Sequence, residues 1–92
     1  MLKFECDNAK AQANLAKHGV SFEEAASVFG DPLALTFSDP DHSVGEARFL
    51  TFGLSRNGRL LAVAHAERGR NIIRIISARR ATRHEKGIYE QG

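Results

Sequence analysis

The chain has 92 residues, of which 42% are hydrophobic and 26% charged, so we expect one globular domain over residues 1–92. The single cysteine, Cys6, excludes an internal disulfide. No segment reaches the roughly 20 apolar residues of a membrane-spanning helix, so we expect a cytoplasmic protein without membrane contact. Residues 1–47 carry three lysines against eight acidic residues, whereas residues 48–92 carry ten basic residues against three acidic ones. The basic half suits a phosphate-rich ligand or an acidic partner, unless the two halves interleave in the fold and their charges cancel.

A short strand over residues 2–6 and a first helix over residues 8–18 are predicted at the N-terminus. Asp7 is a suitable N-cap for this helix, and Gly19 is placed to end it in the left-handed conformation. Side chains at i, i+4 and i+7 share a helix face, which predicts one packed stripe and one solvated stripe. The packed stripe is Ala11, Leu15 and His18, and the solvated stripe is Lys10, Asn14 and Lys17.

A second helix is predicted directly after Gly19. Ser21 and Glu24 have the spacing of a capping box, in which each side chain bonds the other residue's backbone N–H. Apolar residues then recur at helical spacing, which predicts a buried face, and the segment 30–32 ends the helix. The buried face consists of Phe22, Ala25, Ala26 and Phe29.

The middle of the chain has the pattern of an antiparallel meander. Residues 33–38 alternate between apolar and polar side chains, which is typical of a half-buried strand. Two further strands, residues 47–55 and 59–67, flank Asn57-Gly58, the strongest short hairpin signal. The next strand, residues 72–78, holds four isoleucines and is expected to lie in the centre of the sheet.

The last element is a short polar helix within residues 79–90. Thr82 and Glu85 have capping-box spacing, and Gly87 is expected to weaken or end the helix. The predicted order is β-α-α-β-β-β-β-α. This order indicates an α+β fold with one small antiparallel sheet, helices packed mainly on one face, and the other face partly open.

Two segments resemble the BrnT toxin family. The first is Lys17-His18-Gly19 followed by the helix that begins Phe-Glu-Glu-Ala, and the second is the segment 74–79, Arg-Ile-Ile-Ser-Ala-Arg. The resemblance extends over residues 4–89. It implies a RelE/ParE-like fold and ribonuclease activity of a type II toxin that inhibits growth. It also implies neutralisation by a ribbon–helix–helix antitoxin similar to BrnA, with operator DNA contacted only through the antitoxin complex.

Ribonuclease activity of this kind is expected to need neither a metal nor a cofactor. The 2′-hydroxyl attacks the adjacent phosphate and leaves a cyclic phosphate, which requires a base, an acid and positive charge on the developing phosphorane. The sequence has no cysteine and histidine spacing typical of zinc, and no aspartate spacing typical of calcium. We therefore expect a metal-independent endoribonuclease.

The candidate catalytic residues lie mainly on the predicted strands. Strand alternation places His65 and Glu67 on one side, where they form an acid–base pair if that side is the open face. Arg79 is expected at the edge of the same face, with Arg68 nearby. His18 is a second acid–base candidate. Each histidine also has a purely structural interpretation: His65 as a hydrogen-bonded histidine at the edge of the core, and His18 as a cation at a helix C-terminus.

Several basic residues are candidates for phosphate binding. Arg74 lies inside the isoleucine-rich strand, where it must either pair with a neighbouring acid or meet phosphate on the open face. Each of the others has the alternative of being ordinary solvated surface. The full set of predicted RNA-binding residues is Lys17, Arg74, Arg80 and Arg83.

Two other functions remain alternatives. One is a toxin of the same fold that blocks a protein target, as ParE-like relatives do. The other is a decayed toxin that acts only within a protein–DNA complex. Cleavage of RNA by the pure protein in the presence of a chelator separates the first hypothesis from both.

Overall fold

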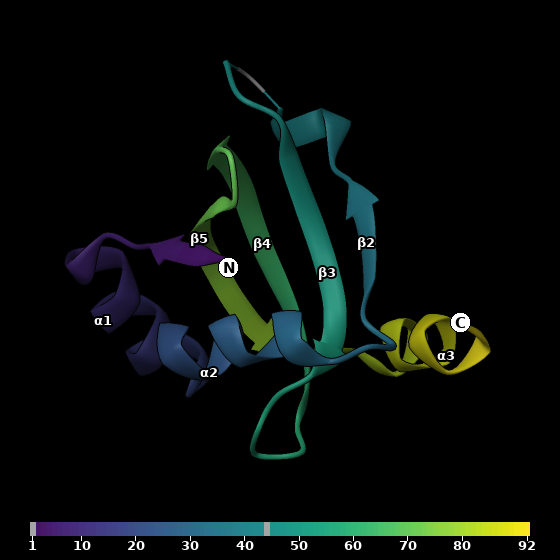
Figure 1. Cartoon of the computed structure of the whole chain (residues 1–92). Coiled ribbons are helices and arrows are strands. Elements are labelled where there is room, and N and C mark those ends of the chain that lie inside the picture. The colour runs from purple at the N-terminus through teal and green to yellow at the C-terminus, as the bar shows by residue number, and fades with distance from the viewer. Residues whose placement is uncertain (1, 44) are drawn as a thin grey trace.

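The computed structural model describes residues 2–43 and 45–92. Five strands form one sheet in the order β1-β5-β4-β3-β2 (Figure 1). Their bounds are β1 Lys3–Glu5, β2 Leu35–Ser38, β3 Arg48–Leu54, β4 Leu60–Gly69 and β5 Ile72–Arg80. The helices are α1 (Asn8–His18), α2 (Phe22–Ser27) and α3 (Arg83–Gln91), with 3₁₀ turns at Val28–Gly30 (η1) and Pro40–His42 (η2). None of these helices is long and apolar enough to cross a membrane.

The sheet is mixed, which corrects the antiparallel sheet predicted from the sequence. Strands β2 to β5 form the expected antiparallel ladder, and the isoleucine-rich β5 is an interior strand between β1 and β4. However, β1 pairs with β5 in parallel, with Phe4 opposite Ile73. Nearly the whole chain separates these two strands, so no hairpin turn constrains their relative direction.

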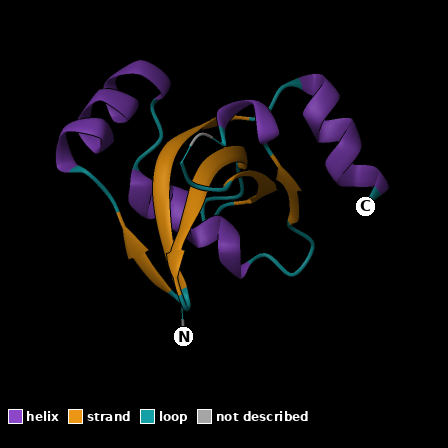
Figure 2. Cartoon of the chain, turned by 90° about the horizontal axis from the view of Figure 1, so that it is seen from above, coloured by secondary structure: helices purple, strands orange, loops and turns teal. Residues whose placement is uncertain are grey.

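The helices divide between the two faces of the sheet. Helices α1 and α2 cover one face, where a hydrophobic core is buried. Its buried members are Val20, Phe22, Ala25, Val28, Leu61, Val63, Ile75 and Ala78. Helix α3 lies at the other side of the molecule from α1 (Figure 2). Its residue Ile88 shares a surface hollow with Leu50 and Phe52, which point away from α1 and α2. The prediction that helices pack mainly on one face therefore holds for two of the three helices.

Helix α1 has the predicted ends but a different buried face. Asp7 accepts hydrogen bonds from two backbone N–H groups in the first turn, and Gly19 is left-handed with φ of 68°. Asn14, predicted to be solvated, is only 7% exposed, whereas Leu15, predicted to pack, is 51% exposed. The Asn14 amide bonds both backbone groups of Ala78, at 2.7 and 3.0 Å. Since β1 ends before this point, the amide serves as the missing strand partner of β5.

Helix α2 departs from the predicted capping, whereas α3 has the capping box that was predicted. Ser21 caps α2 by accepting from the Glu24 N–H, but the Glu24 carboxylate bonds Ser55 and Arg59 in the turn between β3 and β4 instead of closing the box. In α3 the capping box of Thr82 and Glu85 is complete. Gly87 does not end α3, because tertiary contacts made by Glu85 and Tyr89 fix the helix on both sides of the glycine.

Candidate nucleic-acid interface

The register of the strands decides which side chains reach the open face. On β4, Leu61, Val63 and His65 point to the helix-covered face, and the alanines between them point to the opposite face. Ala66 is paired with Arg48 on β3 and with Arg74 on β5. Arg48, Ala66 and Arg74 therefore form a row across the open face, with the small alanine between two arginines.

Three arginines of the open face surround one carboxylate. Glu46, on the loop before β3, lies 3.4 Å from Arg68 Nη1, 3.4 Å from Arg74 Nη2 and 3.8 Å from Arg48 Nε. Glu5 of β1 adds a second carboxylate, 3.7 Å from Arg68 Nε. Three positive and two negative charges leave the cluster with one net positive charge. Some acids of the N-terminal half thus interleave with bases of the C-terminal half, but they do not cancel them here.

Two hollows with basic lining residues continue this surface towards α1. The first, of about 650 Å³, is lined by Lys10, Arg68 and Arg74 together with residues of β1. The second is lined by Lys10, Lys17, His18 and residues of β5. Lys10 belongs to both hollows, so a continuous basic border runs from the arginine cluster to the C-terminal end of α1. Helix periodicity predicted Lys10 only as part of a solvated stripe, because periodicity does not show which strand a helix crosses.

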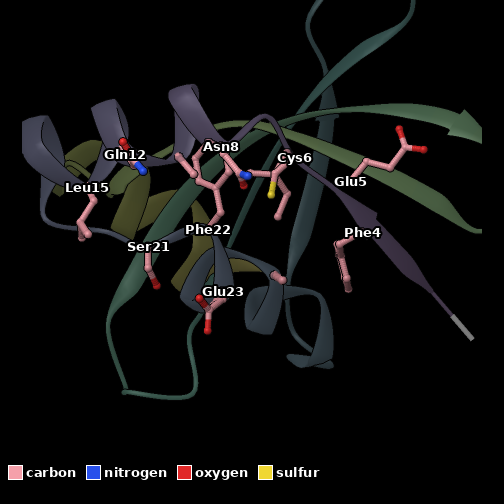
Figure 3. Close-up of a pocket in the computed structure, with 12 residues that line it drawn as sticks. Phe4, Glu5, Cys6, Asn8, Gln12, Leu15, Ser21, Phe22 and Glu23 are labelled. Carbon is pink, nitrogen blue, oxygen red and sulfur yellow. The ribbon is translucent and has the colours of Figure 1, made fainter.

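A third hollow is apolar and has a different character (Figure 3). It has a volume of about 310 Å³ and lies between β1, α1 and α2. Phe4, Leu15 and Phe22 line it, and its charged lining residues are acidic. Because this groove presents no basic side chain, it is not suited to bind a phosphate.

His65 lies inside the covered face and not at the open one. It is 3% exposed, packs edge-on against Phe29 and stacks on Phe49. Its Nε2 lies 2.7 Å from Thr51 Oγ1, while Nδ1 is buried and has no hydrogen-bond partner within residues 2–43 and 45–92. The structure thus matches the structural interpretation of His65, as a histidine of the core. Glu67, two residues further on, is exposed and does not share this environment.

Because His65 is buried, the stability of the folded protein is expected to depend on pH. Burial lowers the pKa of the ring from 6.5 to about 4, because a charged ring there would be unpaired. The unfolded chain binds this proton at higher pH than the folded chain, so stability is complete above pH 6.5 and is lost as the pH falls towards 4. We expect the free energy of unfolding to fall by about 3 kcal/mol across this window, measured by urea titration.

The matched variants for this pH prediction are His65→Phe and His84→Gln. Phenylalanine retains the aromatic contacts and removes the proton, so the decrease between pH 6.5 and 4 should disappear. His84 is exposed, and its replacement should leave the decrease intact. A parent protein with constant stability over this window would show that the folded ring is open to solvent.

Arg79 lies on the open face but is held by another residue. Both of its terminal nitrogens bond the Glu85 carboxylate of α3, at 2.7 and 2.8 Å. These hydrogen bonds from Arg79 lower the pKa of Glu85 to about 2. The pair attaches α3 to the sheet, five residues along β5 from Arg74.

The expected joint site of His65 and Arg79 is not formed, because the two side chains lie on opposite faces. Simple alternation along β5 would place both on one side. A β-bulge intervenes: Ala64 pairs with Ser77 but His65 pairs with Ile75, so Ile76 is an extra residue. The bulge reverses the alternation for the segment up to Arg79.

The remaining candidates lie apart from the arginine cluster. Arg80 and Arg83 are exposed near the junction of β5 and α3. Lys17 and His18 join the basic border along α1, as described above. The structure therefore brings Arg68 and Arg74 together and adds two residues that the sequence analysis did not select, Arg48 and Glu46. Neither lies in a motif: Arg48 lies in the predicted strand 47–55, and Glu46 directly precedes that strand.

Comparisons with known proteins identify the family and the overall fold. Residues 6–85 match the model of a family described as the ribonuclease toxin, BrnT, of type II toxin–antitoxin systems. The crystal structure of the Brucella abortus ribonuclease toxin BrnT is similar, with a TM-score of 0.70 and 25% sequence identity. That alignment covers 90% of this chain and 100% of the Brucella chain. No curated protein matches the chain.

Proposed function

Because the chain belongs to the BrnT family of ribonuclease toxins of type II toxin–antitoxin systems, we propose that it cuts cellular RNA on the open face of its sheet. The observation that carries this proposal is the group of Arg48, Arg68 and Arg74 on three neighbouring strands. Guanidinium groups bind phosphate through two parallel hydrogen bonds and stay charged at any physiological pH.

The proposed reaction is metal-independent. A base takes the proton of the RNA 2′-hydroxyl as its oxygen attacks the adjacent phosphorus. The bond from phosphorus to the 5′-oxygen breaks and an acid gives that oxygen a proton, so the products are a 2′,3′-cyclic phosphate and a 5′-hydroxyl. Negative charge builds up on the phosphate oxygens during the attack. Fixed arginines on a strand stabilise that charge without having to reorganise. Lys10 and Lys17 extend the binding surface from the arginine cluster along α1.

The partner in the cell is an antitoxin, as the family implies. We propose that it is a ribbon–helix–helix protein, that operator DNA is contacted only through the complex, and that the toxin acts in the cytoplasm. We also propose a RelE/ParE-like relationship for the fold, since the open sheet face bears the basic residues. The alternative is a non-cleaving toxin that binds a protein target or acts only as a co-repressor.

Cleavage by the pure protein tests the proposal. The toxin is incubated with RNA in excess chelator, and the products are examined for cyclic phosphate and 5′-hydroxyl ends. We expect cleavage that persists in chelator, and no cleavage of a matched RNA whose 2′-hydroxyls are methylated. Cleavage that requires added Mg²⁺ would contradict the metal-independent mechanism. A folded protein that leaves RNA intact would favour the non-cleaving alternative.

A further inference from the structure

The Glu46 carboxylate occupies a position that suits a phosphate. It is 20% exposed and lies between arginines from β3, β4 and β5. A carboxylate and a phosphodiester both carry one negative charge and present two oxygen acceptors, so they compete for the same guanidinium donors. The site is therefore built for an anion that its own chain supplies in the free protein.

The contacts of Glu46 are loose compared with the other arginine–carboxylate pairs of this chain. Arg79 and Glu85 pair at 2.7 and 2.8 Å, and Arg59 Nε lies 2.9 Å from the Glu24 carboxylate. These distances are normal for charge-assisted hydrogen bonds, whereas every nitrogen–oxygen distance to Glu46 is 3.4 Å or longer. The pairs Arg79–Glu85 and Arg59–Glu24 are therefore tight structural links, whereas the contacts of Glu46 with its arginines are weak.

Donors in the cluster remain unused. Arg48 Nε is buried, yet it has no hydrogen-bond partner in the part of the chain that the structure describes. Each guanidinium carries five N–H donors, so three of them greatly exceed the acceptor capacity of one carboxylate. A buried donor without an acceptor carries a free-energy penalty, which a better-placed anion would relieve.

Release of Glu46 does not disturb the sheet. Glu46 lies on the loop that precedes β3, outside the paired residues of the strands. Gly45, directly before it, has φ of 82°, a left-handed conformation that favours glycine. A rotation of the Glu46 side chain therefore frees the arginines while all ladder hydrogen bonds stay in place.

We propose that Arg48, Arg68 and Arg74 form a binding site for one phosphate group of the RNA strand, and that Glu46 fills this site until the phosphate displaces it. The inference rests on the proposed function and names the phosphate position within it. The exchange replaces one negative charge by another, so it leaves the charge of the cluster unchanged. The polar hollow beside Arg68 and Arg74 has a volume of about 650 Å³, which is within the usual range of ligand sites.

The test measures binding separately from cleavage. The probe is a fluorescent ten-nucleotide RNA with 2′-O-methyl groups, which presents phosphates but lacks the attacking hydroxyl. Glu46→Gln is expected to tighten its binding by about fivefold, the upper range for loss of a partly exposed ion pair. Glu23→Gln is the control, since it makes the same change of net charge at an exposed position on α2 and should alter affinity by less than a factor of about two.

The arginines give the second part of the test. Arg74→Gln should weaken binding and reduce the slope of log affinity against log salt by about 0.7, the value for one phosphate contact on a single strand. The double variant Arg68→Gln/Arg74→Gln then serves as a second background. In this background Glu46→Gln should raise the RNA affinity no more than Glu23→Gln does. Thermal unfolding confirms that each variant is folded, and Glu46→Ala replaces Glu46→Gln if glutamine disturbs the loop.

The outcomes separate this inference from the proposed function. Equal affinity gains for Glu46→Gln and Glu23→Gln would show that Glu46 does not compete with phosphate. Weaker RNA binding by the Glu46→Gln variant would show that the Glu46 carboxylate holds the arginines in place for RNA. Either result would overturn the inference while cleavage by the parent protein upholds the proposed function. A parent protein that neither binds the probe nor cuts ordinary RNA would overturn both.

Discussion

Replacement of Arg74 by alanine is expected to slow RNA cleavage by about 100- to 1000-fold, the range found when one donor to a developing oxyanion is removed. Arg74 lies 3.4 Å from Glu46 and also lines the polar hollow beside β1 and α1, so it links the arginine cluster to that hollow. Its loss removes a fixed positive charge from the site where the phosphorane forms. The measurement is the single-turnover cleavage rate of a short RNA at saturating toxin.

Two control variants make the Arg74 result interpretable. Arg74→Lys retains the charge but cannot hold two phosphate oxygens at once, so it should restore only part of the rate. Arg56→Ala removes an exposed arginine in the turn between β3 and β4 and should leave the rate unchanged. Since the Arg74 side chain also covers part of the sheet, thermal unfolding must show that the variant is folded. A folded Arg74→Ala protein with the parent rate would remove this residue from the RNA site.

Replacement of Glu24 by alanine is expected to lower the free energy of unfolding by about 3–5 kcal/mol, as for other buried ion pairs that lose one partner. Glu24 is 3% exposed and accepts hydrogen bonds from Ser55 Oγ and from two nitrogens of Arg59. The hydrogen bonds from Arg59 lower the pKa of Glu24 to about 2. The stability from this group is therefore complete above pH 4.5 and is lost as the pH falls towards 2.

The Glu24 effect is measured by urea unfolding at pH 7. For a domain of this size, the expected loss corresponds to a decrease in melting temperature of at least about 12 °C. Glu23→Ala is the matched control, because the neighbouring carboxylate is exposed. The double variant Glu24→Met/Arg59→Met should recover much of the loss, since it leaves no unpaired charge. A loss below about 1 kcal/mol for Glu24→Ala would mean that water replaces the carboxylate without difficulty.

The sequence by itself determined the local features of this protein. The N-cap at Asp7, the left-handed Gly19 and the capping box of Thr82 and Glu85 each involve residues no more than a few positions apart. The Asn-Gly turn likewise places Gly58 at φ of 77° between two strands. Interactions of such short range depend on residue type and spacing, so they can be predicted from the chain alone.

Motif and charge also indicated the class of function before any contact was known. The segment Arg74–Arg79 and the Lys17-His18-Gly19 turn resembled the BrnT family, and a family model matches residues 6–85. The basic C-terminal half suggested a phosphate-rich ligand. Arg68 and Arg74, both chosen from the sequence, lie in one cluster on the open face.

Only the tertiary structure decided which side chains meet. The bulge at Ile76 reversed the alternation of β5, so Arg79 lies on the opposite face from His65, and η1 covered His65 with Phe29. Asn14 was buried because β1 ends short of Ala78 and leaves that edge of β5 without a strand. Glu46 met arginines up to 28 positions away because three strands bring them together. A one-residue change of register exchanges the two faces of a strand, and register is set by pairing between distant segments, which local sequence does not specify.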